Sequence, residues 1–304
     1  MTQIPFAKFQ AVGNDFIVVG TAGLPRSLCK FARAILNRRI GIGADGLLVL
    51  SPSSGKKGDV RLRFFNADGS EAEMSGNGIR CAGAFLADLF PTRRTFRIET
   101  LAGWKSLERV KHGKGRCFFR VGMGAPVLEP ARIPFEAGDS PAPITSFPLR
   151  TELGVVSVTV TSMGNPHCSI LVAPGFSPAG MVLLPEAEWP GARPELLPEE
   201  WERLGREIEM NPLFPNRTNV EFVRVISRKE IAVRFWERGV GHTLSSGTGS
   251  CAATVACILN GLTDRQVRVQ TQAGLLRVAW PENGEVILTG PVERIAQGTY
   301  NYML

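Results

Sequence analysis

Several residue types and patterns that mark common protein classes are scarce in this 304-residue sequence. It has three histidines and six cysteines, and no two cysteines are spaced Cys-x-x-Cys. A Cys/His metal site therefore has little support, and a chain of this length does not suggest a disulfide framework. No run reaches 18 uncharged apolar residues, and the first ten residues lack a basic segment followed by an apolar one. We therefore expect a reduced, cytoplasmic, metal-free protein that neither carries a signal peptide nor spans a membrane.

Clustered positive charge is also missing, although the net charge is +7, from 35 Lys and Arg against 28 Asp and Glu. The basic runs, such as Lys56-Lys57 and Arg93-Arg94, are short and have no aromatic residues between them. This pattern is typical of a solvated basic surface and argues against nucleic-acid binding. The length favours two domains.

What the sequence does contain is an internal repeat. Three short segments of the first half recur in the second half, and each pair is separated by 171 positions. Three matches in one register indicate two homologous halves. The pairs are Arg63–Asn66 with Arg234–Glu237, Ser75–Gly78 with Ser246–Gly249, and Thr100–Gly103 with Thr271–Gly274.

Each half has the pattern of a mixed α/β fold. Strand-length apolar runs at 60–65 and 231–236 precede Ala-rich helices predicted at 79–90 and 250–262, whose small residues suit a helix buried inside a sheet. A Pro-rich stretch at 124–148 reads as the crossover, and 197–210 as an amphipathic helix. Further strands are predicted at 16–19, 47–50, 154–161, 169–172, 220–225, 267–271 and 275–279.

One Gly-rich segment, Gly41–Gly46, matches the letters of the dinucleotide-binding motif GxGxxG. That motif must follow a strand and open a helix, whereas this segment leads into the strand-like run 47–50. Dinucleotide binding is therefore not expected. Walker A and GxSxG sequences are missing, so nucleotide hydrolysis and α/β-hydrolase chemistry have no support either.

The turns Ser75–Gly78 and Ser246–Gly249 stand directly before the two Ala-rich helices. A Gly-rich turn at a helix start exposes N–H groups at the positive end of the helix dipole, which suits a carboxylate. Each serine could equally be an ordinary N-cap followed by flexible glycines. Two such turns at equivalent places favour a ligand site, with one turn from each half facing a common cleft.

Polar residues near these turns would suit an amino acid as ligand. A single asparagine is more commonly a turn residue, but together these side chains could line a site for a zwitterion, with Arg238 pairing a carboxylate bidentately. Inverting an α-carbon without a cofactor needs a base on one face and an acid on the other, and a duplicated fold can supply one from each half. The candidates are Asn14, Asn66, Asn165, Asn219, Glu237 and Arg238.

These motifs resemble those of the diaminopimelate epimerase family nearly from end to end. The resemblance implies a cofactor-independent isomerase that interconverts LL- and meso-diaminopimelate in lysine and peptidoglycan synthesis; relatives in the wider superfamily act on other amino acids. The matching segments are Gly13–Phe16, Gly41–Leu47, Phe65–Arg80, Gly164–His167, Arg217–Val220 and Glu237–Gly249.

The family resemblance also implies the architecture. It predicts an α/β (α+β) fold of two pseudo-symmetric domains, each a mostly antiparallel sheet around a central helix, with the active site in the cleft between them. The last strand is expected to return to the first domain, which gives domains of 1–123 plus 291–304 and of 124–290. No cofactor or metal is expected, and a homodimer is kept as an option.

The resemblance assigns roles to individual residues. Substrate contacts fall to the six polar candidates, and backbone N–H groups of the turns would hold the reacting carboxylate. His167 and Glu237 would lie near the catalytic pair. The turn residues concerned are Gly76, Asn77, Gly247 and Thr248.

The sequence departs from the family at the two catalytic positions, where Ser75 and Ser246 replace cysteines that act as thiolate base and thiol acid. A cysteine titrates near ~8.5, and lower at a helix N-terminus, whereas a serine hydroxyl is essentially never ionised near neutrality. No evident histidine base takes the place of the cysteine, unless His242 or His167 reaches the site. Epimerisation is therefore predicted to be severely impaired.

Three interpretations of the serines stay open: a double Cys→Ser variant made to retain bound substrate, a natural homologue that binds without this chemistry, and a slow serine-based epimerase. Two further departures weaken the assignment to diaminopimelate rather than another amino acid. Gly46 stands where some members have a substrate-facing glutamine, and His242 where acidic residues are common.

Overall fold

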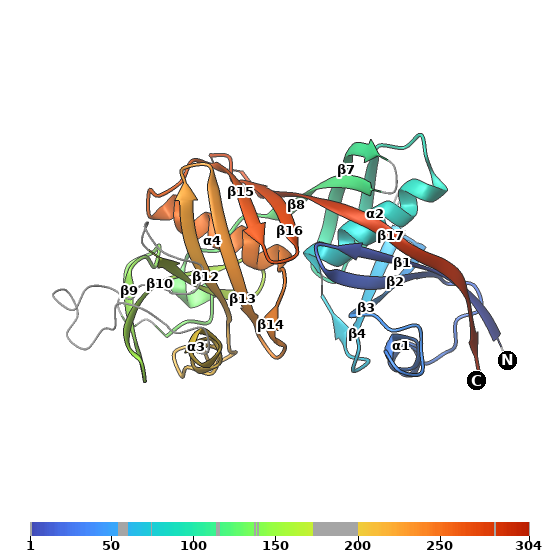
Figure 1. Ribbon diagram of the computed structural model, residues 1–304, viewed down its shortest axis with the longest axis horizontal. Helices are drawn as coiled ribbons and strands as arrows, with labels where there is room; N and C mark the ends of the chain where they lie inside the picture. The colour runs from blue at the N-terminus through green and yellow to red at the C-terminus, as the bar shows by residue number, and fades with distance from the viewer. Residues whose placement is uncertain are drawn as a thin grey trace. The chain divides into compact units, whose positions relative to one another are not determined.

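A computed structural model describes residues 2–53, 60–73, 75–113, 116–136, 138, 140–172, 200–282 and 284–303. The chain forms two compact units, Met1–Gly122 with Leu288–Leu304 and Met123–Ile287. Each unit has its own central helix with strands around it (Figure 1).

The first unit is a ring of strands. In order of pairing the ring runs β17–β1–β2–β3–β4–β6–β7–β8, and a pairing of β8 with β17 closes it. Among the strand pairs of this unit whose residue register is described, only β2–β3 and β4–β6 are parallel, as expected for a mostly antiparallel sheet. The elements are β1 (Thr2–Ala11), β2 (Asn14–Gly20), α1 (Leu28–Leu36), β3 (Gly46–Pro52), β4 (Val60–Asn66), β5 (Glu71–Ala72), α2 (Gly76–Leu89), β6 (Thr95–Thr100), β7 (Gly103–Gly113), β8 (Arg116–Gly124) and β17 (Val286–Tyr302).

Helix α2 is the central helix of the first unit, and nearly all of its residues are buried. It contacts β1, β2, β3 and β7. Small residues allow this close approach: a Cβ on Gly83 would lie 2.8 Å from Leu107 and 3.2 Å from Phe119. The Ala-rich composition thus follows from the space inside the ring.

Helix α1 covers the other face of the same strands (Figure 1). Side chains alternate between the faces of a strand, and the odd-numbered residues of β2, β3 and β4 form the side that packs against α1. This cluster joins strand residues to helix residues: Ile17, Val19, Leu47, Val49 and Phe65 with Phe31, Ala32, Ile35 and Leu36.

The second unit repeats the pattern with its own strands. Pairing runs β9–β10–β11–β12–β13–β15–β16, with β11–β12 and β13–β15 parallel. Helix α4 is buried and contacts β10–β13, β15 and β16. The elements are η1 (Pro130–Arg132), β9 (Phe147–Thr151), β10 (Gly154–Ser162), β11 (Pro166–Val172), α3 (Glu200–Glu209), β12 (Asn219–Ser227), β13 (Glu230–Glu237), β14 (Gly241–Thr243), α4 (Gly247–Leu259), β15 (Gln266–Thr271) and β16 (Gly274–Ala279).

The duplication extends to individual hydrogen bonds. The Thr100 hydroxyl donates to the Gly103 carbonyl at 2.7 Å, and 171 positions later the Thr271 hydroxyl donates to Gly274 at 2.8 Å. The strand pairs β4–β6 and β13–β15 are both parallel and occupy equivalent places. The repeat read from the sequence is therefore a repeat of structure.

Three segments differ in detail from the predictions. The central helices begin earlier than 79 and 250, at Gly76 and Gly247, because the serine before each one acts as N-cap. The helix predicted at 197–210 is α3, Glu200–Glu209; 197–199 lie outside the described residues. The predicted crossover at 124–148 also serves the core of the second unit, to which it adds Ile133, Phe135 and Ile144.

The last strand returns to the first unit, where β17 pairs with β1 from Thr2↔Tyr302 to Gln10↔Glu293.

None of the helices in the described ranges has the length and the apolar composition that crossing a membrane requires.

Candidate functional site

The serine turn of the first unit is built by an N-cap. Ser75 has an extended backbone, and its Oγ accepts a hydrogen bond from the Gly78 N–H at 3.1 Å. The N–H groups of Gly76 and Asn77 also lie in the first turn, where an α-helix provides no acceptor of its own. The geometry thus fits the predicted carboxylate-binding turn and an ordinary cap alike.

Side chains around this turn hold the asparagine candidates in place. Asn77 Nδ2 donates to Asn14 Oδ1 at 3.3 Å, and Asn14 Nδ2 donates to Asp45 Oδ2 at 2.6 Å. Below the turn, Arg80 is fully buried and donates to Asn77 Oδ1 at 2.7 Å and to the Gly76 carbonyl at 2.9 Å. Asn14 and Asn77 therefore belong to one network with a buried cation under it.

Charged partners fix the outer end of the network. Arg38 contacts Asp15 and Asp45 at 2.7 Å each, and Lys8 contacts Asp15 at 2.9 Å. Burial alone would raise the pKa of Asp15, but hydrogen bonds from Arg38 and Lys8 outweigh it and the pKa lies below its usual range. Asp15 thus stays ionised beside Asn14.

Asn66 ends β4 and lies at the same sheet end as Asn14. It faces Gly46 across the β3–β4 pair, and Gly46 in turn faces Phe16 on β2. Asn66 Nδ2 donates to Ser70 Oγ at 3.0 Å. The structure thus brings Asn14, Asn66 and the Ser75 turn to one region of the first unit.

Gly46 has no room for a side chain. A Cβ there would lie 2.4 Å from Cε2 of Phe64 and 3.0 Å from Phe16, whose rings pack edge to face with centroids 5.9 Å apart. The Phe64 side chain occupies the space that a residue larger than glycine would need at position 46.

Gly46→Ala is therefore expected to lower the free energy of unfolding by about 1–3 kcal/mol, because the added methyl group must displace two packed rings. Urea unfolding measures this change. The matched control is Gly20→Ala at the end of β2, where an added Cβ meets no heavy atom of the described chain within 4 Å. Equal effects of the two substitutions would contradict the packing argument.

The serine turn of the second unit has the same cap and an added partner. Ser246 Oγ accepts from the Gly249 N–H at 3.2 Å and donates to Glu237 Oε2 at 3.1 Å. The other carboxylate oxygen of Glu237 accepts from the Thr243 hydroxyl at 2.6 Å. Ser246 is thus in direct hydrogen-bond contact with a carboxyl group.

The Glu237 carboxyl is surrounded by protein atoms although the residue keeps part of its surface exposed. Loss of water around the carboxyl raises its pKa above 4.5; the hydroxyls of Thr243 and Ser246 and the charge of His167 oppose this shift, and Glu221 adds to it. Desolvation wins, so Glu237 holds a proton to higher pH than an exposed glutamate does.

His167 is completely buried on the same face as Glu237, between two oxygen partners. Its Nδ1 lies 2.6 Å from Glu221 Oε1, and its Nε2 lies 3.0 Å from Asn165 Oδ1. Glu221 also accepts from the Ser169 hydroxyl at 3.2 Å. The bond to Glu221 fixes the orientation of the His167 imidazole, and the other ring nitrogen of His167 holds the Asn165 side chain.

Asn219 and Arg238 form the remaining corner. Asn219 Nδ2 donates to the Pro166 carbonyl at 2.9 Å, and its Oδ1 accepts from the Arg238 N–H at 3.1 Å. The exposed Arg238 side chain donates through Nη1 to the Asn216 carbonyl at 2.9 Å. The second unit thus gathers Asn165, His167, Asn219, Glu237 and Arg238 around the start of β12 and the end of β13.

Three positioning residues were not predicted from the sequence: Arg80, Asp45 and Glu221. Arg80 and Glu221 each leave a signal, since each is a charged residue with apolar neighbours, in the Ala-rich helix and in strand 220–225 respectively. Such a charge is buried only with a partner. Asp45 lies in the Gly-rich segment 41–46, which precedes a strand as expected.

The cysteines nearest the turns do not replace the missing thiols. Cys81 and Cys251 are both fully buried in the central helices. Burial raises the pKa of the Cys81 thiol far above its ordinary value, so it does not ionise near neutrality. Within the described ranges, no group of three or more His, Cys, Asp and Glu side chains could hold a metal ion.

Comparison with known families gives one family-level match. The model of the family described as diaminopimelate epimerase matches residues 6–129 and 192–295. Curated relatives include diaminopimelate epimerases of Halothermothrix orenii, 40% identical over 298 residues covering 97% of each chain, and of Pelotomaculum thermopropionicum, 41% identical over 302 residues covering 98% of this chain and 99% of the relative.

Solved structures share the duplicated fold at low sequence identity. A hydroxyproline epimerase from Agrobacterium vitis has a TM-score of 0.64 at 14% identity, covering 99% of this chain and 94% of that one. A probable proline racemase from Agrobacterium radiobacter has a TM-score of 0.65 at 15% identity, covering 99% and 93%. These likenesses concern the fold alone.

Proposed function

Because this chain belongs to the diaminopimelate epimerase family, we propose that it is an isomerase scaffold for the interconversion of LL- and meso-diaminopimelate, with proton transfer suppressed by serine at positions 75 and 246. The observation that carries the proposal is the pair of equivalent helix N-termini, each capped by serine and each flanked by polar side chains. We propose that the reaction belongs to lysine and peptidoglycan precursor synthesis in the cytoplasm and requires no cofactor or metal.

Epimerisation removes the α-proton from one face of the α-carbon and delivers a proton to the opposite face. One group removes the α-proton and leaves the bonding electron pair on the carbon and its carboxylate; the group on the opposite face then donates a proton to that carbon. The first-turn N–H groups of α2 and α4 would stabilise the charge that builds on the carboxylate. Two-base chemistry requires both turns to act on the same carbon, so each is assigned to one face.

Serine keeps the binding side of this mechanism and removes the acid–base side. Both hydroxyls satisfy a helix N–H, at Gly78 and Gly249, so the turns keep their shape. A hydroxyl does not supply the anion that an epimerising base must have near neutral pH. The expected phenotype is binding of an amino-acid substrate with little or no inversion.

Contacts to the rest of the substrate are proposed for the asparagines and for Arg238, with His167 and Glu237 beside the reacting pair. In support, each unit gathers its share of these residues at one place, next to its serine turn. The chain is proposed to act either alone or as a homodimer.

The alternative is a catalytically inactive amino-acid-binding homologue, or a related racemase with another amino-acid substrate. Deuterium incorporation at the α-carbon of LL-diaminopimelate in heavy water separates these functions, because binding alone does not exchange the proton. We expect slow or no incorporation with serine at both positions and fast incorporation with cysteine there. A cysteine-containing chain that binds but exchanges nothing would favour the inactive homologue.

The raised pKa of Glu237 predicts a pH dependence of stability. The folded state favours the protonated carboxyl, so the contribution of Glu237 is fully present below the unfolded pKa and is lost as pH rises through the folded pKa. The free energy of unfolding of this chain, relative to Glu237→Gln, should therefore fall above pH 4.5, by at most about 1.4 kcal/mol per pH unit. Urea unfolding from pH 4 to 8 measures the difference.

The matched control is Glu230→Gln on the same strand. Hydrogen bonds from Gln270 and Arg268 lower the pKa of Glu230. The stability that Glu230 contributes is therefore lost in the opposite direction, as pH falls below the usual pKa of a glutamate. Parallel pH profiles for this chain and Glu237→Gln would show that the Glu237 carboxyl has an ordinary pKa.

A further inference from the structure

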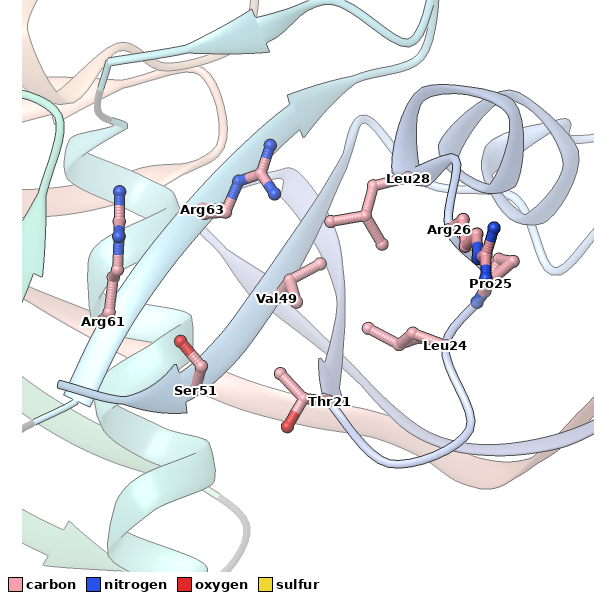
Figure 2. Close-up of a pocket in the computed structure, with 9 residues that line it drawn as sticks. All are labelled: Thr21, Leu24, Pro25, Arg26, Leu28, Val49, Ser51, Arg61 and Arg63. Atoms are coloured by element: carbon pink, nitrogen blue, oxygen red, sulfur yellow. The ribbon is translucent and has the colours of Figure 1, made fainter.

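A cavity of about 340 Å³ lies in the first unit and plays no part in the proposed reaction (Figure 2). It is formed by the loop after β2, the start of α1, the middle of β3 and the first half of β4. Figure 2 shows the apolar side chains of Leu24, Leu28 and Val49 between Arg26 on the loop and Arg61 and Arg63 on β4. The cavity thus combines an apolar floor with cations on two sides.

The residues that line this cavity carry charge of one sign. Among its lining residues three are arginines, two carry hydroxyls, Thr21 and Ser51, and none is acidic. Arg26 and Arg61 are exposed, and in the described ranges neither guanidinium is held by a hydrogen bond or a close ion pair, although Arg61 lies near enough to Glu71 to interact with its charge. Both guanidinium groups therefore remain available to an anion.

The third arginine is held in a fixed position. Arg63 donates through Nε and Nη2 to the two carboxylate oxygens of Glu71, at 2.7 Å each, and its guanidinium carbon lies 4.9 Å from the centre of the Phe65 ring. These two bonds leave Nη1 as a donor. A guanidinium fixed in this way loses little rotational freedom when a ligand binds.

Helix α1 adds a fourth favourable feature. It begins at Leu28, which lines the cavity, and its first turn contains no acidic residue. Ser27 caps only the Lys30 N–H, at 3.4 Å. The positive end of the helix dipole is thus at the cavity without a charge from its own sequence to balance it.

Strand geometry separates this cavity from the Ser75 turn. Val49, Ser51, Arg61 and Arg63 are on the α1 side of the strands, where Val49 pairs with Arg63 and Ser51 with Arg61. The α2 side carries Phe16 and Leu48, which a Cβ on Gly78 would contact at 3.3 Å. The cavity and the serine turn therefore lie on opposite faces of the same strands and toward opposite ends.

We propose that this cavity binds a small organic anion, whose carboxylate or phosphate group meets the three arginines and whose apolar part lies on Leu24, Leu28 and Val49. Charge-assisted bonds from arginine supply the affinity for the anionic group, and the apolar floor selects against a bare inorganic ion. The site is separate from the one proposed for diaminopimelate.

Isothermal titration of the full chain with phenyl phosphate, benzoate and benzyl alcohol tests the proposal. These probes share a ring and differ in the charged group, so the first two distinguish phosphate from carboxylate and the third is neutral. We expect at least one anion to bind about tenfold or more tighter than benzyl alcohol, and more weakly as salt is raised. Equal binding of all three, or none, would overturn the proposal.

Two variants locate the binding. Arg26→Gln/Arg61→Gln should lower the affinity for the preferred anion at least about tenfold. The matched control is Arg39→Gln/Arg94→Gln, which removes the same two charges from exposed residues of the first unit outside the cavity. An unchanged affinity in Arg26→Gln/Arg61→Gln, or an equal loss in the control, would show that the anion binds elsewhere.

Discussion

Ser75→Cys/Ser246→Cys is expected to raise deuterium incorporation at the α-carbon of LL-diaminopimelate by at least about 100-fold and up to about 10⁴-fold, the range that a positioned acid or base contributes. A thiol at a helix N-terminus ionises near neutral pH, whereas a serine hydroxyl does not. The rate should rise with pH as the thiolate forms. Proton NMR in heavy water follows the loss of the α-proton signal, and chromatography separates the LL and meso products.

Variants with only one of the two thiols, or with a thiol at another helix start, serve as controls for this experiment. Ser75→Cys and Ser246→Cys alone supply one of the two groups, so each should epimerise more slowly than the double variant. Ser27→Cys places a thiol at the N-cap of α1, a third helix start, and should leave exchange at the level of this chain. If the double variant exchanges no proton, the scaffold is not an epimerase. If this chain already exchanges as fast as the variant, the serines do not limit it.

Arg238→Ala is expected to weaken binding of meso-diaminopimelate by about 10- to 150-fold, the loss for a hydrogen-bonded charged group of about 1.5–3 kcal/mol. The local backbone should keep its shape, because the Asn219 side chain holds the Arg238 N–H rather than its guanidinium. Titration calorimetry on the serine-containing chain measures affinity without turnover. Arg238→Lys should fall between the two, since lysine keeps the charge but not the bidentate geometry.

The matched control for this effect is Arg277→Ala on β16. Arg277 is an exposed arginine of the same unit and faces Arg268 on the neighbouring strand. Arg277→Ala removes the same charge at a position away from the candidate residues. The affinity for meso-diaminopimelate should therefore stay within about twofold of that of the unchanged chain. An unchanged affinity in Arg238→Ala itself would refute the carboxylate-binding role.

The sequence predicted those parts of the fold that repeat or alternate. The 171-residue offset identified equivalent turns and helices in the two halves, because a duplicated fold imposes the same caps and hairpins twice. The strands were found from runs of apolar residues, since each strand buries at least one face. Helix starts were placed about three residues late, because a Gly-rich first turn lacks the apolar period that marks a helix.

Side-chain partners across strands were harder to predict. The contact of His167 with Glu221 joins residues 54 positions apart through a parallel strand pair, whose register no local pattern records. The space at Gly46 is set by Phe64 and Phe16, which belong to two other strands. Arg80 meets the turn only because α2 brings residues three and four positions apart to one side. Those distances required the three-dimensional structure.

The ring of the first unit has a consequence for how the chain folds during synthesis. Strand β17 pairs with both β1 and β8, so the two strands on either side of it have their full hydrogen bonding only after nearly the whole chain has left the ribosome. Until then the nascent chain carries two open sheet edges, while the segment Met123–Ile287, translated in between, already contains β9 to β16. Open edges invite pairing with other chains, so the late arrival of β17 makes the first unit the part most exposed to misassembly.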